Sequence, residues 1–143
     1  KHQGITDRRL LDKEDLLKKI HSLSEANPML GHRGCRLGLT YPEIYRMQVR
    51  AIFEALVLLK KENISTCVEI EIPLVIDQSE LAILKEEITA VHAEVSQESG
   101  LELEYMLGTM LELPRACVMA DELAVDAEFF SFGTSDHPGI QPR

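Results

Sequence analysis

The sequence has little of what marks several large classes of protein. It contains no tryptophan, aromatic residues make up 5% of it, and its formal net charge is −9. The acidic balance argues against a nucleic-acid partner, because phosphate backbones are bound by clustered Lys and Arg. No apolar run approaches the roughly 20 residues that a helix needs to cross a bilayer, which argues against a membrane-embedded chain. The charged N-terminal residues are also atypical of a secretory signal.

Cysteine is scarce as well. Cys35, Cys67 and Cys117 are widely spaced, and no CxxC pair is present. A structural zinc site is therefore poorly supported, because its ligands usually come in closely spaced pairs. A sparse, odd number of cysteines favours a reducing compartment. We expect all three to be small buried apolar residues.

Helical and strand patterns alternate along the rest of the chain. Helices are expected at 12–25, 40–61, 79–99 and 116–126, and extended segments at 29–37, 68–76, 105–113 and 128–132. This alternation predicts an α/β fold, with a parallel sheet and helices outside it. A closed eight-stranded barrel needs about 250 residues, so the chain fits either about half of a (β/α)8 TIM barrel or a small open α/β domain.

Two details of these helices are specific enough to test. Thr40 and Glu43 have the spacing of a capping box at the start of the long helix. Two apolar stripes recur at helical spacing. They are Ile44, Met47, Ala51, Ala55 and Leu58 on the long helix, and Leu84, Ile88, Val91 and Val95 on the next one.

Acidic residues follow the last two expected strands. Glu112 closes one strand, and Asp136 follows the other after the turn of Gly133, Thr134 and Ser135. Consecutive strands of a parallel unit end at the same edge of a sheet. Two carboxylates there can hold a hard cation such as Mg²⁺. The backbone N–H groups of the turn suit an anionic, phosphorylated substrate beside that cation.

A candidate anion ligand lies near the start of the chain, in NPMLGHRGCRLGL. Its glycines allow a ligand to approach the backbone closely, and arginine offers a planar fork for phosphate or carboxylate. Arg33 and Arg36 are three residues apart, so on a regular strand they would face opposite sides and only one would reach the site. Arg33 is the stronger candidate, and Arg36 stays open between a ligand and a surface residue.

Three ordered segments give the chain a family resemblance. NPMLGHRGCRLGLTYPEIYRMQVRAI, GTMLELPRA and AEFFSFGTSD together resemble the C-terminal phosphoenolpyruvate- and pyruvate-binding barrel of the pyruvate, phosphate dikinase family. The resemblance implies that residues 1–136 are part of this barrel domain, containing its third to sixth strands. Residues 137–143 then form a divergent tail.

The resemblance also implies roles for the candidate residues. Glu112 and Asp136 match Mg²⁺ ligands, and Arg33 matches an arginine that grips the substrate, phosphoenolpyruvate or pyruvate. Residues 133–135, with Asp136, match a turn whose backbone contacts that substrate. Ser135 stands where the family pattern has Asn, so backbone contact is expected there rather than contact through an amide side chain.

Other parts of the family's machinery have no counterpart here. The resemblance places a second substrate-binding arginine, the cysteine proposed as general acid/base, and the ATP-binding and phosphohistidine domains elsewhere. No residue is therefore assigned a catalytic role, and turnover by this chain alone is not expected. The family is cytosolic in many organisms and organellar in some, such as in plastids or glycosomes, so the cytoplasm is the expected location.

Two alternatives remain open. A non-catalytic α/β module that acts through homo- or hetero-association would also fit, because a half-barrel exposes two strand edges and an apolar layer. A small open α/β domain whose acids and arginines are incidental is the other.

Overall fold

The computed structural model describes residues 8–24, 27 and 30–133 of the chain. It divides into two units, Lys1–Gly31 and His32–Arg143. The first unit holds helix α1 (Arg8–Ser22), on which Leu16, Leu17 and Ile20 are each more than half exposed. The predicted first helix is thus confirmed, although it begins and ends a few residues earlier than expected.

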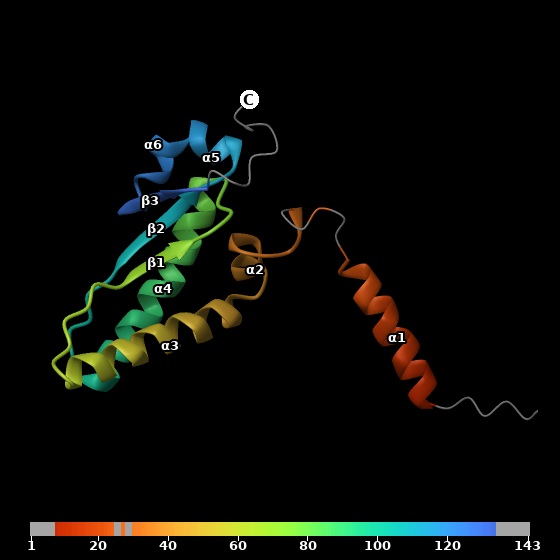
Figure 1. The fold of residues 1–143 in the computed structure, drawn as a ribbon, viewed down its shortest axis with the longest axis horizontal. Coiled ribbons are helices and arrows are strands. Elements are labelled where there is room, and N and C mark those ends of the chain that lie inside the picture. The colour runs from red at the N-terminus through yellow and green to blue at the C-terminus, as the bar shows by residue number, and fades with distance from the viewer. Residues whose placement is uncertain (1–7, 25–26, 28–29, 134–143) are drawn as a thin grey trace, which may run out of the picture. The chain divides into compact units, whose positions relative to one another are not determined.

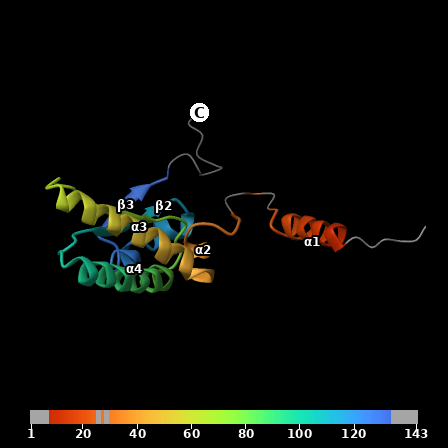
Figure 2. The same cartoon turned by 90° about the horizontal axis from the view of Figure 1, so that it is seen from below.

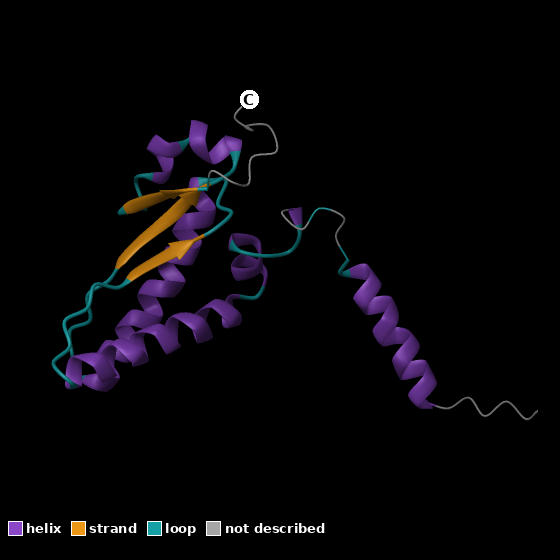
Figure 3. Ribbon diagram, in the orientation of Figure 1, coloured by secondary structure: helices purple, strands orange, loops and turns teal. Residues whose placement is uncertain are grey.

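The second unit is an α/β arrangement around a small sheet. Its elements are α2 (Cys35–Thr40), α3 (Pro42–Lys61), β1 (Glu69–Ile72), α4 (Gln78–Ser99), β2 (Met106–Leu111), α5 (Pro114–Val118), α6 (Ala120–Leu123) and β3 (Phe129–Phe132) (Figure 1). The strands lie in the order β1-β2-β3, and both pairs are parallel (Figure 3). The predicted α/β fold with parallel strands is confirmed.

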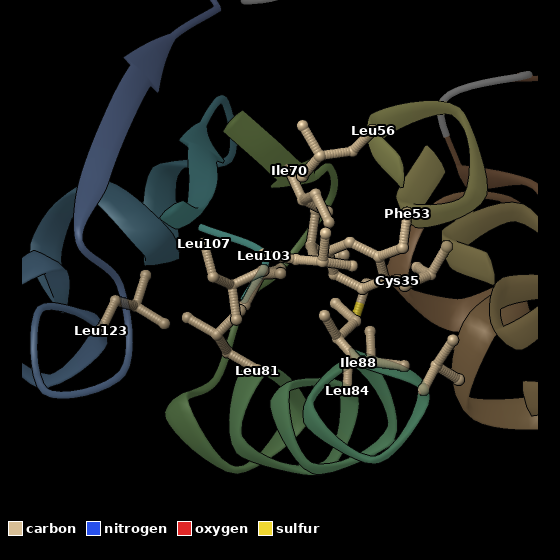
Figure 4. Close-up of a cluster of buried hydrophobic side chains, with 14 of the residues drawn as sticks. Cys35, Phe53, Leu56, Ile70, Leu81, Leu84, Ile88, Leu103, Leu107 and Leu123 are labelled. Atoms are coloured by element: carbon tan, nitrogen blue, oxygen red, sulfur yellow. The ribbon is translucent and has the colours of Figure 1, made fainter. Parts of the chain in front are cut away.

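The helices of this unit share one hydrophobic core with the sheet. Figure 4 shows Phe53 of α3, Ile70 of β1, Leu84 of α4, Leu107 of β2 and Leu123 of α6 in a single cluster. Side chains alternate between the two faces of a strand, so Ile70 and Leu107 mark the face that the helices cover. Helices α3 and α4 pack directly on each other beside the sheet (Figure 2). No described helix is both long and apolar enough to cross a bilayer.

Helix α4 matches its predicted pattern closely. Its buried side chains include all four of the predicted stripe: Leu84, Ile88, Val91 and Val95. It ends at Ser99, and Gly100 follows in the left-handed conformation with φ 67°. Glycine takes this conformation without steric cost, which explains why the helix stops there.

Helix α3 departs from its predicted stripe. The buried side chains are Val49, Phe53, Leu56 and Val57, whereas Met47 and Leu58 are 64% and 62% exposed. The helix is apolar on more than one side, so spacing alone did not determine which side is buried. On the same helix, Arg46 pairs with Glu87 and Glu94 of α4, and Arg50 pairs with Glu98.

The predicted capping box at the start of α3 is wrong. Tyr41 is the N-cap residue and makes no side-chain cap hydrogen bond, although Pro42 does occupy the first turn as expected. The Thr40 hydroxyl instead donates to the Arg36 carbonyl at 2.9 Å. Thr40 is the last residue of α2, so its side chain bonds back into that helix.

The segment expected to be extended at 29–37 is not a strand where it is described. Residues 30–34 form turns, and α2 begins at Cys35. Gly38, within α2, allows close packing, since a Cβ there would lie 3.0 Å from side-chain atoms of Tyr45 and Leu84. The described part of the chain therefore contains three strands of the expected four.

The connection between β2 and β3 is also more broken than predicted. The single helix expected at 116–126 is two short helices, α5 and α6, that meet at Met119. Strand β1 ends at Ile72 and is shorter than the extended segment expected at 68–76, because Pro73, the next residue, has no N–H for the ladder.

Candidate functional site at the carboxyl edge of the sheet

The carboxyl ends of the three strands meet at one edge of the sheet, because the strands are parallel. Leu111 of β2 lies beside Phe132 of β3, and the Gly133 N–H donates to the Leu111 carbonyl at 3.4 Å. Glu112 and Gly133 follow directly and lie side by side. A Cβ added to Gly133 would lie 2.8 Å from the Glu112 Cβ, so only glycine fits this closely.

Glu112 is a buried carboxylate, with 5% of the residue exposed. Its Oε1 accepts a hydrogen bond of 2.7 Å from the backbone N–H of Leu74. Leu74 lies two residues after the end of β1. Within residues 8–24, 27 and 30–133, no lysine or arginine forms an ion pair with it. A buried carboxylate is costly without a compensating positive charge, so this site suits a cation.

The turn before α2 reaches the same edge. Gly34 has φ 56°, and a Cβ added to it would lie 2.9 Å from the Pro73 oxygen and 3.0 Å from Leu74 Cδ1. The Cys35 N–H donates to that Pro73 oxygen at 2.9 Å. Arg33 immediately precedes Gly34 and is exposed. The structure thus brings the backbone of the predicted anion ligand to the edge that carries Glu112.

The loop after β1 is held on several sides. Thr109, fully buried in β2, donates its hydroxyl to the Ile72 carbonyl at 2.7 Å. The Ile76 N–H donates to Glu80 Oε2 at 2.9 Å, and the Ile76 carbonyl accepts Arg115 Nε at 3.1 Å. Leu74, within this loop, has φ 64°. Nothing in the sequence marked Leu74, because a leucine in the left-handed region is not signalled by residue type.

The expected burial of the cysteines is confirmed only for Cys35, whereas Cys67 and Cys117 are exposed. Burial of the Cys35 thiol, with the negative charge of Glu80 nearby, raises its pKa to about 12. Cys35 therefore stays a protonated thiol near neutral pH, as a packing residue would. Cys67 lies in the connection before β1 and Cys117 in α5, where solvent reaches both side chains.

Three of the predicted substrate ligands, Thr134, Ser135 and Asp136, lie outside the described residues. The pairing of Glu112 with Asp136 accordingly stays a prediction. The described part of the chain contains no group of three or more His, Cys, Asp or Glu side chains that could hold a metal. Glu112 still fits one Mg²⁺ ligand, because its carboxylate is fixed through Oε1 and forms no ion pair with a described lysine or arginine.

Two buried polar atoms on the sheet were not singled out from the sequence. Glu71 Oε1 on β1 and Ser131 Oγ on β3 have no hydrogen-bond partner within the described part. Both alternate with core residues such as Ile70 and Phe130, so they belong to the face away from the helices. Their only sequence signal was a polar residue inside an apolar run.

Comparison with known proteins identifies the family. Residues 5–138 match the model of the PEP-utilising enzyme, PEP-binding domain. The chain is 49% identical over 126 residues to the chloroplastic pyruvate, phosphate dikinase of Flaveria pringlei, covering 88% of this chain and 13% of that protein. It is 50% identical over 119 residues to the enzyme of Clostridium symbiosum, covering 82% and 14%. The Giardia intestinalis enzyme is 46% identical over 145 residues, covering 94% and 16%.

The chain thus spans between 13% and 16% of the length of these curated relatives. Within that span, the match includes all three strands of the described sheet and the segments that follow their carboxyl ends. The chain belongs to the PEP-utilising enzyme family, and it matches the PEP-binding domain of that family.

Proposed function

We propose that the carboxyl edge of this sheet binds phosphoenolpyruvate or pyruvate together with Mg²⁺, as part of a pyruvate, phosphate dikinase. Such an enzyme interconverts ATP, phosphate and pyruvate with AMP, pyrophosphate and phosphoenolpyruvate. The observation that carries the proposal is the buried Glu112 carboxylate, which has no cationic partner in the described part and lies between the Arg33-bearing turn and Gly133.

Each group at the edge has a physical role in this proposal. Arg33 binds the phosphate or carboxylate of the substrate through its guanidinium fork. Glu112 and Asp136 would hold the cation, and backbone N–H groups of residues 133–135 would face the substrate. When bound, Mg²⁺ supplies positive charge that stabilises an enolate oxygen. Gly133, the first residue of that segment, fits closely against Glu112.

Calorimetric titration of the full chain with Mg²⁺ in the presence of phosphoenolpyruvate tests the proposal. We expect a binding heat in the parent chain that Glu112→Gln abolishes, because glutamine removes the charge but keeps an acceptor for the Leu74 N–H. Glu128→Gln is the matched control. Glu128 also accepts a backbone N–H, from Leu107 at 2.7 Å, but it precedes β3 at the opposite end of the sheet.

Two results would contradict the proposal. One is the absence of heat in the parent chain at millimolar cation and substrate. The other is an equal loss of heat in the Glu112 and Glu128 variants. Equal losses would mean that the heat depends on the overall charge of the chain and not on a binding site at Glu112. Arg33→Lys adds a further arm, in which we expect weaker substrate binding with unchanged binding of Mg²⁺ alone.

Turnover is proposed for a complete enzyme rather than for these 143 residues, which span a small part of the relatives' length. The chain alone should bind without exchanging pyruvate and phosphoenolpyruvate, and measurable exchange of labelled pyruvate would contradict this. We place the protein in the cytoplasm, with a plastid or other organelle as the alternative because a similar protein is named as chloroplastic. Imaging of a fluorescent fusion distinguishes the two.

A second candidate function, association with another chain, rests on the sheet edges. Strands β1 and β3 each pair on one side only within the described residues, and Phe132 of β3 is 70% exposed. Unpaired edges and exposed apolar side chains favour pairing with a further strand. Sedimentation velocity should show a concentration-dependent dimer that Phe132→Lys weakens. A monomer at all concentrations would contradict this alternative.

A further inference from the structure

Two residues with unusual backbones connect the turn before α2 with Glu112. The non-helical residue Gly34 has φ 56° and the buried Leu74 has φ 64°, and they are in direct contact. A side chain disfavours positive φ, so Leu74 keeps this conformation only because its surroundings impose it. The cause of this strain lies in the contacts on either side of Leu74.

The contacts on one side come from the turn before α2. The Cys35 N–H holds the Pro73 carbonyl at 2.9 Å, and Gly34 lies so close to Pro73 and Leu74 that no Cβ fits there. On the other side, the Leu74 N–H donates to Glu112 Oε1 at 2.7 Å. Leu74 itself is 1% exposed, so neither contact can be exchanged for water.

This arrangement decides where the Glu112 carboxylate lies. The left-handed turn at Leu74 aims its N–H at the end of β2 and occupies Oε1, so that Oε2 is the oxygen left for a cation. If the turn relaxed toward an ordinary φ, the N–H would leave Oε1 and the carboxylate could rotate. Groups that orient a metal ligand in this way typically change metal affinity by about ten- to a hundredfold when they are lost.

We propose that Gly34 and Leu74 are positioning residues for Glu112: Gly34 holds the left-handed turn at Leu74, and the Leu74 N–H orients the carboxylate that binds the cation. This rests on the proposed function, because it assumes that Glu112 is a cation ligand. It adds that the affinity for the cation depends on a glycine that cannot touch the cation. The turn that carries Arg33 therefore also controls the orientation of the Glu112 carboxylate, the proposed metal ligand.

Gly34→Ala in the full chain is the central test, with Gly100→Ala as its control. Both glycines have positive φ, 56° and 67°, but Gly34 has ψ −137°, a combination that favours glycine strongly, whereas Gly100 is in the ordinary left-handed region, so alanine meets the larger backbone penalty at Gly34. A Cβ at Gly100 meets nothing within 4 Å, and this residue ends α4 in the connection that leads to the start of β2. Both variants should thus lose some stability, but only Gly34→Ala disturbs Leu74.

Cation affinity is measured with Mn²⁺ by electron paramagnetic resonance and with Mg²⁺ by calorimetry, on samples shown by circular dichroism to be folded. We expect Gly34→Ala to weaken binding by about ten- to a hundredfold and Gly100→Ala to leave it within about twofold. If Gly34→Ala fails to fold, the parent chain supplies the test. Mg²⁺ should then slow the hydrogen exchange of the Leu74 amide, because a cation that fixes the Glu112 carboxylate also holds its hydrogen bond to Leu74, and an unchanged exchange rate at saturating Mg²⁺ would overturn the positioning role.

The Leu74 amide resonance gives a readout that a purely structural role would not move. In the parent chain, Mg²⁺ should shift the ¹H and ¹⁵N frequencies of Leu74, and this shift should vanish in Gly34→Ala but persist in Gly100→Ala. A parent chain that binds no cation overturns the proposed function and the positioning role with it. A parent chain that binds Mg²⁺, together with a Gly34→Ala variant of equal affinity, overturns the positioning role alone.

Discussion

The two ends of the sheet each carry a glutamate that accepts a backbone N–H, and the environments of these two residues differ. Glu112, at the carboxyl edge, accepts from Leu74 and is 5% exposed. Glu128, at the amino edge, accepts from Leu107 at the same 2.7 Å distance and is an exposed residue. Water can solvate the carboxylate of Glu128. The buried carboxylate of Glu112 must instead be stabilised by groups of the protein or of a bound ligand.

This difference shows that two hydrogen bonds of the same length and type can have different roles. At the amino edge it ties the start of β3 to β2, and the Glu128 N–H donates in turn to the Leu107 carbonyl. At the carboxyl edge it fixes one oxygen of a buried charge and leaves the charge itself uncompensated within the described part. Burial, rather than hydrogen-bond geometry, distinguishes the candidate site from a structural contact.

The largest expected difference between the two ends is in cysteine reactivity. Cys35 contacts the carboxyl edge through Pro73 and is fully buried with a pKa of about 12, whereas Cys67 precedes β1 at the amino edge and is exposed. At about pH 8 the Cys35 thiolate would be at least a thousandfold rarer than that of a cysteine with an ordinary pKa near 8.5. Reaction with a chromogenic disulfide should show two fast thiols, Cys67 and Cys117, and one slower by at least about a thousandfold.

Urea provides the control for this measurement, since all three thiols should react at similar rates in the unfolded chain. Peptide mapping after partial labelling with iodoacetamide identifies the slow residue. Fast reaction of Cys35 in the folded chain would mean that the carboxyl edge opens to solvent, and the contrast between the two ends would then fail.

Sequence patterns predicted the elements of the fold better than the details of the site. The buried stripe of α4 followed from apolar spacing, whereas β1 stops before Pro73 and not at the expected residue 76. The stripe of α3 did not follow from spacing, because this helix is apolar on more than one side and tertiary packing selects the side that is buried.

The candidate site was predictable only in part for a similar reason. Acidic residues after parallel strands and glycines beside an arginine can be recognised in the amino-acid sequence, so Glu112, Gly133 and Arg33 could be singled out. The left-handed turn at Leu74 is imposed by tertiary contacts with Gly34 and Glu112. Residue type gave no hint of it, because leucine has no preference for that conformation.

Replacing each glutamate by alanine sharpens the comparison at the level of stability. Glu112→Ala leaves the Leu74 N–H buried without an acceptor, which costs about 1–3 kcal/mol of unfolding free energy. Glu128→Ala removes a hydrogen bond whose acceptor residue is exposed and whose carboxylate water already solvates, so we expect about 0.5–1 kcal/mol. Urea unfolding monitored by circular dichroism measures both. Equal losses would show that burial does not separate the two ends as proposed.

The smallest expected effect is that of replacing Asp77, which lies at the carboxyl edge but has a side chain that is 39% exposed. This replacement distinguishes the effect of position at the edge from the effect of burial. It is the N-cap of α4 and accepts the Ser79 hydroxyl at 2.7 Å and the Ser79 N–H at 3.1 Å. These bonds, with the nearby Arg115 guanidinium, lower the pKa of Asp77. A lowered pKa means that the folded state favours the charged carboxylate, so its contribution is complete above the unfolded pKa near 4 and is lost as pH falls below it.

Asp77→Asn keeps an oxygen acceptor for the cap and removes the charge. Its unfolding midpoint in urea should lie slightly below that of the parent at about pH 7, and the two should converge as pH falls through the lowered pKa of Asp77, where the parent's carboxylate becomes protonated too. Added salt should also reduce the difference, because an exposed charge is screened. If the difference persisted unchanged at low pH, the cap would act through shape rather than charge. If it matched the cost of Glu112→Ala, position at the carboxyl edge would outweigh burial.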